Sequence, residues 1–299
     1  MQKRNLGKNL TNNPNLIPQR NNKQTKIKNS SFFKSFFYID RFWIAILLYL
    51  LVILILPIFA LVNKSWGFSE TNFWEIALHP IAIKTYQITF LLSFLATCFN
   101  GFFGFIITWV LTRYNFYGKK FLDALIDLPF AIPTSVAGLA ISTIYNENIF
   151  LNKIGSSLNI ELTFIKMFSC LVFVSLPFTI RSLQPVLEDF DKQIEEAAWC
   201  LGTSEFETFY KVILPNILPS FFIGLTLSFS RAIGEYGSLV VVSSNIPYKD
   251  LTSSVLIAQR IEQYDYEGAT IIGIVMLTIS LILLLSINLI QSWSQLHEN

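Results

Sequence analysis

Glu196-Ala197-Ala198-Trp199-Cys200-Leu201-Gly202 lies in a charged stretch between two long apolar segments, and Leu214-Pro215 follows twelve residues after Gly202. Alanine has the highest helix propensity, and a glutamate near a helix start complements the helix dipole. Glycine permits a bend or a stop. The spacing predicts a short helix, a turn and an approach helix on the membrane surface. Such an element suits the docking of a soluble partner.

Long apolar segments surround this stretch. The apolar fraction of 53% and the mean hydropathy of +0.50 indicate a membrane protein. A helix of about 20 apolar residues crosses the hydrocarbon core of a bilayer. Six stretches meet this length, and together they predict an all-α integral membrane protein with six transmembrane helices: 42–62, 88–111, 128–145, 162–180, 212–230 and 270–290.

Two of these segments have unusual features. The third contains Pro129 and Pro133, which remove backbone donors and predict a kinked helix. The fourth contains Lys166, whose ammonium we expect to reach an interface from a position near the helix end.

The segment 42–62 exceeds the length of a signal-peptide core, so we expect it to be retained as the first transmembrane helix.

The charge distribution predicts the orientation. Residues 1–39 carry eight lysines and arginines and no acidic residue, so we expect residues 1–41 to form a basic, disordered tail. The positive-inside rule places this tail, the 112–127 loop and the Glu-Ala-Ala loop on the cytoplasm-like side.

The sequence lacks the patterns of common catalytic sites. It contains no phosphate-binding Gly-x-x-x-x-Gly-Lys-Ser/Thr loop, so ATP hydrolysis is expected from a separate subunit. The two histidines, His79 and His297, are too far apart in sequence for a metal or catalytic site, and the three cysteines show no metal or redox spacing. We therefore expect no catalytic residue, metal, cofactor or nucleic-acid partner.

The Glu-Ala-Ala stretch resembles the coupling loop of permease subunits of bacterial-type ABC importers. That family's pattern is Glu-Ala-Ala, three residues, Gly, nine residues, Ile, one residue and Leu-Pro, and Val212 stands here at the Ile position. The resemblance implies a type I ABC importer permease fold over residues 82–293, with a coupling loop at about 188–215. It also implies these ATPase-coupling residues: Glu196, Ala197, Ala198, Gly202, Val212, Leu214 and Pro215.

Four further stretches, 109–120, 127–134, 231–238 and 263–269, resemble sulfate and molybdate permeases. The stretch 231–238, with Tyr236, is most similar to the T-type sulfate permeases. The resemblance implies import of sulfate and thiosulfate, with a molybdate or tungstate permease as the alternative. A membrane scaffold that docks an ATPase without conducting anything is a third hypothesis.

The same resemblance implies the partners: a second sulfate permease subunit, a dimer of ABC ATPase subunits, a soluble sulfate-binding protein, the sulfate anion and membrane lipid. The abundance of Asn, Lys, Ile and Phe suggests an AT-rich genome. The plastid (chloroplast) inner membrane is the first expectation for location, and a bacterial inner membrane is the alternative.

Arg231 and Glu235 are ionisable residues that follow directly after the fifth predicted span, 212–230. Their i,i+4 spacing predicts a salt bridge on one helix face. The pair is either structural or provides a positive field for a passing dianion. Tyr236, Pro129 and Pro133 complete the candidate pathway set. Asp127, next to Pro129, is expected to cap the third helix.

Overall fold

The computed structural model describes residues 41–66, 70–147 and 161–297, and this part of the chain is helical with no strand. It divides into two compact units, Met1–Ala60 and Leu61–Asn299. The all-α prediction is confirmed. The predicted disordered tail lies outside the described residues, apart from Arg41.

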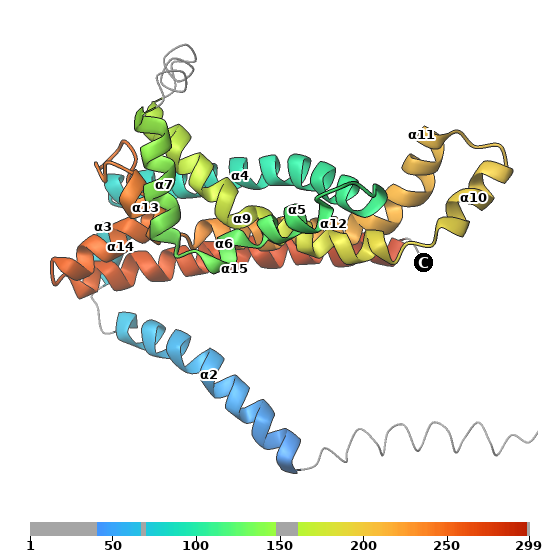
Figure 1. Cartoon of the computed structure of the whole chain (residues 1–299). Coiled ribbons are helices and arrows are strands. Elements are labelled where there is room, and N and C mark those ends of the chain that lie inside the picture. Colours follow the sequence, from blue (N-terminus) through green and yellow to red (C-terminus); the bar gives the residue numbers. More distant parts are fainter. Residues whose placement is uncertain (1–40, 67–69, 148–160, 298–299) are drawn as a thin grey trace, which may run out of the picture. The chain divides into compact units, whose positions relative to one another are not determined.

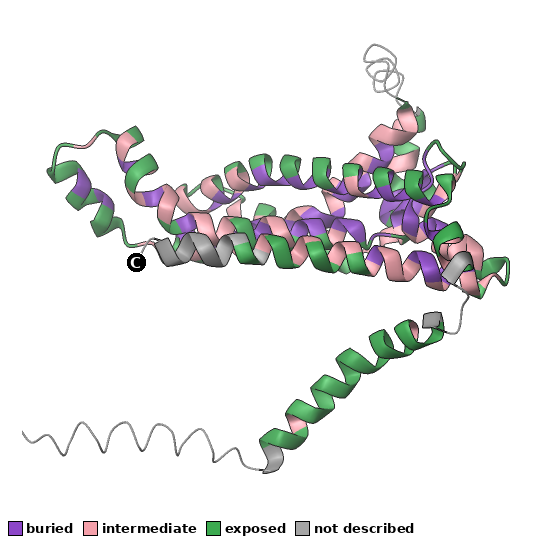
Figure 2. Ribbon diagram, turned by 180° about the vertical axis from the view of Figure 1, so that it is seen from behind, coloured by how far each residue is buried: buried purple, intermediate pink, exposed green. Residues whose placement is uncertain are grey.

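Helix α2 (Arg41–Trp66) contains the first predicted span and includes Pro57. Its 22-residue section Trp43–Lys64 is long and apolar enough to cross a membrane. Figure 2 shows it exposed along almost its whole length. A helix that is apolar all round needs an apolar environment on every side, which lipid or another protein chain provides.

Four helical stretches of the second unit are also long and apolar enough to span a membrane. Two of them are the helices α4 (Pro80–Arg113) and α9 (Leu162–Glu188). The third, Glu205–Ile233, contains α12 (Leu214–Ile233), and the fourth, Tyr266–Ile287, belongs to α15 (Tyr266–His297). Helices α4, α9 and α12 pack against one another, and α15 contacts α12. Lys166 lies near the start of α9, as expected, and its ammonium donates to Asn146 Oδ1 at 2.5 Å.

The third predicted span, a kinked helix over 128–145, is interrupted in the structure and forms α6 (Leu128–Ala131) and α7 (Thr134–Glu147). The short helix α5 (Lys119–Ile126) precedes them. Ile132, between α6 and α7, has extended backbone angles, which the following Pro133 favours. Among the described residues, therefore, five helices rather than six meet the length for a span.

The short helices gather at opposite ends of the second unit (Figure 1). At one end lie α3 (Glu70–Ala77), α13 (Gly237–Val242) and α14 (Ser253–Glu262). At the other end lie α10 (Lys192–Cys200) and α11 (Glu205–Thr208), followed by the π-helical turn η1 (Phe209–Ile213). Helix α9 continues to Glu188, beyond the predicted end of the fourth span at residue 180, so Arg181 lies inside a helix.

The core has two parts. The larger contains Leu92, Met167, Leu171 and Ile272, and the smaller contains Leu183, Leu187, Ile213 and Ile217 near α10 and α11. Asn100 of α4 joins the long helices, because its Nδ2 donates to Ser175 Oγ at 2.8 Å and to Ser228 Oγ at 3.3 Å. Polar side chains stabilise helix association in membranes in this way.

Candidate functional site

The spacing of the Glu-Ala-Ala motif is explained by the way α10 ends. Gly202 has φ +89°, the left-handed conformation that glycine adopts without strain. Its N–H donates to Trp199 O at 2.9 Å, and Thr203 N–H donates to Ala198 O at 3.3 Å. These two bonds form a Schellman C-cap. In this cap the left-handed glycine stands four residues after the residue whose carbonyl accepts the second bond. The spacing between Ala198 and Gly202 in the motif is this interval.

Ala198 faces the rest of the chain, not solvent. It is 8% exposed, and Thr203 Oγ1 donates to its carbonyl at 2.8 Å and shares a hydrogen bond with Thr208. A small side chain here lets α10 and α11 approach closely. Ala198 is therefore covered by the chain itself, whereas Glu196 and Ala197 are exposed.

The outward face of this region is apolar and aromatic. We call residues 191–215 the Glu-Ala-Ala segment. Leu201 is 86% exposed and Phe206 is 78% exposed, and they extend from the turn and from α11. Three other large side chains of the segment are exposed as well: Ile194, Trp199 and Tyr210. The segment therefore leaves several large apolar side chains uncovered by the rest of the described chain.

An ion pair anchors the segment to α4. Arg113, the last residue of α4, lies 2.5 Å from Glu195 through its Nη1, and both side chains are largely buried. The guanidinium carbon lies 5.0 Å from the ring centroid of Trp109 and 5.8 Å from that of Phe190. Among the described residues, Arg113 Nε and Nη2 have no hydrogen-bond partner, so stacking on the rings replaces part of their solvation.

The return path to the membrane follows local rules. Ser204 and Glu207 begin α11, and the Ser204 hydroxyl accepts from Glu207 N–H at 3.2 Å. Pro215 stands in the first turn of α12 and has no N–H for the preceding turn. The preceding residues, with Val212, form the π turn, a usual form for an interrupted helix. Leu214 begins α12 and lines the smaller core.

The predicted Arg231–Glu235 salt bridge is present, with Arg231 Nη1 2.7 Å from Glu235 Oε2. Glu235 is only 1% exposed, whereas the Arg231 side chain is 31% exposed. The other carboxylate oxygen, Oε1, accepts from Ser238 N–H at 2.9 Å and from Ser238 Oγ at 3.0 Å. Ser254 Oγ also donates to the Glu235 carbonyl at 2.7 Å. Four contacts from three residues therefore fix the break between α12 and α13.

The candidate pathway residues divide between two places. Tyr236 follows Glu235 directly and is partly exposed. Pro133 lies close to Tyr236, because the residues that follow them are in contact. The Thr134 hydroxyl lies where a Cβ atom on Gly237 would be. Pro129 instead lies in α6, and the next residue, Phe130, packs its ring edge-on against the ring of Phe178 in α9. The structure thus joins Pro133 to the Arg231–Glu235 region and leaves Pro129 beside α9.

A protein-family model matches residues 100–295, about two thirds of the chain, with the description "Binding-protein-dependent transport system inner membrane component". The chain belongs to this family. It is 53% identical over 257 residues, 85% of this chain and 90% of the relative, to the "Probable sulfate transport system permease protein cysT" of Chlorokybus atmophyticus. It is 49% identical to the protein of the same printed name from Marchantia polymorpha, over 81% of this chain and 85% of the relative. The "Sulfate transport system permease protein CysT" of Synechocystis sp. is 49% identical, over 86% and 91%.

Solved structures agree with the fold of this transport-system component. A chain of a bacterial ABC transporter for import of the acidic polysaccharide alginate matches with a TM-score of 0.67 at 14% identity, covering 90% of this chain and 98% of that chain. A second structure of an alginate ABC transporter, with a pentasaccharide-bound periplasmic protein, gives a TM-score of 0.66 at 17% identity and covers 88% and 95%. The type I importer fold is confirmed.

Sequence reasoning missed one polar cluster of this transport component. Asp127 makes no capping hydrogen bond, so the expected cap is wrong. Its two carboxylate oxygens instead accept from Arg181 Nε and Nη2, each at 2.8 Å. Asp123 also pairs with Arg181. The signal available in the sequence was the pair of aspartates four residues apart, which places both on one helix face.

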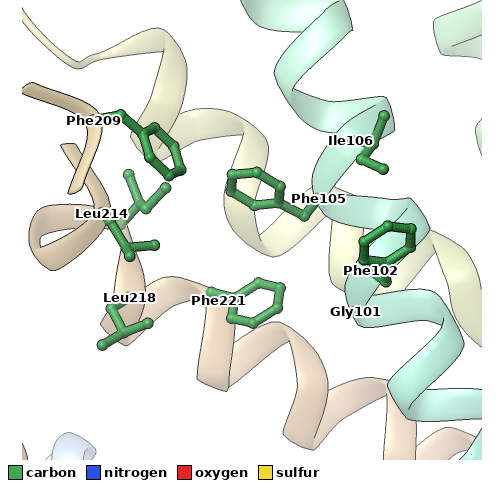
Figure 3. A pocket seen from close by; sticks show the side chains of 9 residues that line it. Gly101, Phe102, Phe105, Ile106, Phe209, Leu214, Leu218 and Phe221 are labelled. Atoms are coloured by element: carbon green, nitrogen blue, oxygen red, sulfur yellow. The ribbon is translucent and has the colours of Figure 1, made fainter. Parts of the chain in front are cut away.

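An apolar pocket of about 370 Å³ lies between α4 and α12, close to η1 (Figure 3). It is lined by Gly101, Phe102, Phe105, Ile106, Phe209, Leu214, Ile217, Leu218 and Phe221. An unpaired anion is not stable in such surroundings, because no polar group replaces its hydration. This pocket is therefore not an anion site. In the described part of the chain, no group of three or more metal-ligating side chains is present either.

Proposed function

We propose that this chain is the T-type permease subunit of an ATP-driven importer that translocates sulfate and thiosulfate. The observation that carries the proposal is the identity of about one half, over more than four fifths of the chain, to proteins named as sulfate transport permeases. The molybdate or tungstate alternative has no such support among these relatives. The algal and liverwort relatives favour a plastid inner membrane, and the cyanobacterial relatives are compatible with a bacterial one.

The Glu-Ala-Ala segment is the proposed contact with the ATPase subunits. Its coupling residues are Glu196, Ala197 and Gly202, with Leu201 and Phe206 as the apolar anchors. The exposure of these two large side chains supports this assignment, because buried apolar anchors carry much of the free energy of an interface. Ala198, Val212, Leu214 and Pro215 contribute by fixing the shape of the segment.

The proposed mechanism is mechanical. The full transporter would contain a second permease, two copies of the ATPase and a soluble sulfate-binding protein that delivers the anion. ATP binding and hydrolysis by the partner would favour one arrangement of the docked segment over another. The helices then alternate between two access states whose populations follow the nucleotide state of the partner.

Arg231, Glu235 and Tyr236 are the proposed pathway residues, with Pro133 beside them. Arg231 is the partly exposed member of the pair and provides a positive charge for a dianion. Glu235 is buried and compensates that charge. An ion pathway requires binding that is weak enough for release.

The test is uptake of labelled sulfate in cells that lack their own sulfate permease and express the full transporter. We expect uptake that requires this chain and that unlabelled thiosulfate reduces. Uptake of labelled molybdate without uptake of sulfate would overturn the substrate assignment.

A second test addresses the scaffold hypothesis. Cys200 is exposed on the Glu-Ala-Ala segment, so a thiol cross-linker can be placed there without a new cysteine. We expect it to capture the ATPase subunit in intact membranes. Substitution of Gly202 by tryptophan disfavours the φ of +89° and is expected to reduce both docking and uptake. Uptake that survives the loss of docking would refute the coupling role.

A further inference from the structure

The interrupted region α5–α6–α7, residues 119–147, contacts two parts of the molecule. We call it the strut. At its start Arg181 of α9 binds α5 and the residue before α6, and further along α7 lies against α13. The end of α7 also meets α9, where Lys166 donates to Asn146. Neither α5 nor α6 contains a buried residue. Packing alone therefore holds this part of the strut weakly, and its attachment depends strongly on polar contacts.

Arg181 uses every donor of its guanidinium. Two bonds go to the Asp127 carboxylate, at 2.8 Å each, in the bidentate arrangement that arginine favours. Nη1 donates to Asp123 Oδ1 at 2.8 Å and to Gln184 Oε1 at 2.6 Å. Nη2 donates to the Asp123 carbonyl at 2.8 Å. Four of the five acceptors belong to the strut, so Arg181 fixes both its position and its orientation.

The same polar cluster continues along α9 toward the Glu-Ala-Ala segment. Gln184 Nε2 donates to Glu188 Oε1 at 2.9 Å, and Glu188 is the last residue of α9. Only residues 189–191 separate α9 from α10. A displacement of α10 therefore acts on the end of the helix that carries Arg181.

Further along, the strut rests on the backbone beside Glu235. A side chain added at Gly138 of α7 would lie 2.7 Å from Ser238 O and 2.9 Å from Ser238 Cα. Ser238 is the residue that donates twice to Glu235. Because no flexible side chain separates the two backbones, movement of α7 moves the hydrogen-bond partners of Glu235.

We propose that Arg181 is a positioning residue of transport, which transmits movement of the Glu-Ala-Ala segment through the strut to the Arg231–Glu235 pair. The inference rests on the proposed function. Arg181 contacts neither the ATPase nor the anion in this scheme, and it acts by keeping the strut attached to α9.

The test compares transport with ATP hydrolysis in the full transporter carrying Arg181→Gln. We expect the ratio of anion uptake to hydrolysis to fall roughly five- to 150-fold, the range of a typical coupling free energy between sites. Arg260→Gln is the matched control, because Arg260 pairs with Asp265 at similar exposure and lies outside the strut. That control should leave the ratio unchanged.

A second variant separates transmission from folding. Asp127→Asn leaves the contacts of Arg181 with Asp123 in place, so it should assemble and lower the ratio less. The double variant Arg181→Gln with Asp127→Asn should be no worse than Arg181→Gln alone, because both changes remove the same contact. Equal losses of uptake and hydrolysis, additive effects, or a ratio that Arg260→Gln lowers equally would overturn the inference. Absence of sulfate uptake by the unmodified transporter would instead count against the proposed function.

Discussion

The contact between α7 and α13 allows a sharp prediction, the effect of Gly138→Ala. The added methyl carbon would lie 2.7 Å from Ser238 O, 2.9 Å from Ser238 Cα and 3.2 Å from Ser238 C. All three atoms belong to the backbone, so no rotamer change can relieve the overlap. The two helices must move apart by several tenths of an ångström.

The size of the effect follows from two opposing contributions. Overpacking costs about 1–3 kcal/mol, and the upper part of that range, about 2–3 kcal/mol, applies here because only backbone atoms are met. Replacing glycine by alanine inside a helix returns up to about 1 kcal/mol. We therefore expect a net loss of about 1–2 kcal/mol in the free energy of unfolding, which lowers the melting temperature by about 2–8 °C in a chain of this size.

The assay is the thermal unfolding of the purified chain in lipid nanodiscs. Gly273→Ala is the matched control, because Gly273 lies inside α15 and an added side chain there meets nothing within 4 Å. That variant should melt at the wild-type temperature or above it. If Gly138→Ala unfolds at the same temperature as Gly273→Ala, α7 and α13 are not in contact as described, and the argument for the strut fails with it.

Three further predictions concern other parts of the chain. Leu201→Ala and Phe206→Ala should each weaken ATPase binding by roughly tenfold or more, measured by pull-down from membranes, with unchanged melting of the chain because both side chains are exposed. Glu235→Gln should lower the free energy of unfolding by about 1–3 kcal/mol, less than for a fully buried pair because Arg231 is partly exposed, and an unchanged melting temperature would contradict this. The pKa of Asp265 is lowered chiefly by the hydrogen bond from Gly268 N–H and further by Arg260. The ionised carboxylate therefore stabilises the fold fully above the unfolded pKa of about 3.9, and this stabilisation is lost as the pH falls through the lower folded pKa. Asp265→Asn should make acid unfolding less steep in this range, and identical acid-unfolding curves would refute the prediction.

Local sequence rules sufficed for the Glu-Ala-Ala segment. Its helix, its turn at Gly202 and the restart at Leu214 depend on bonds between residues at most five apart, and such bonds are encoded in short motifs. The exposed side chains on its outward face also lie within this short stretch. The internal direction of Ala198 was not predicted, because it depends on how α10 and α11 fold onto each other.

The third span shows where sequence reasoning reached its limit. Mean hydropathy over 128–145 is high enough for a span, and the two prolines predicted only a kink. The break at Ile132 follows from Pro133, but where the short helices lie depends on distant contacts, here between Arg181 and two aspartates 54 and 58 residues earlier. Neither hydropathy nor helix periodicity contains that pairing.

The two interpretations of the Arg231–Glu235 pair, structural and functional, describe one physical arrangement. Two unit charges 4 Å apart interact by about 4 kcal/mol at an effective dielectric constant of 20, and a dianion opposite a lone arginine would gain about twice that. Glu235 lies 2.7 Å from Arg231 and offsets much of this attraction. If Arg231 is the proposed pathway residue, the partners that hold Glu235 in place would set how tightly an anion binds, because a shift of Ser238 would change how fully the carboxylate compensates Arg231. A stable Arg231–Glu235 pair beside the contact of α7 with α13 is thus compatible with anion binding in one access state and anion release in the other.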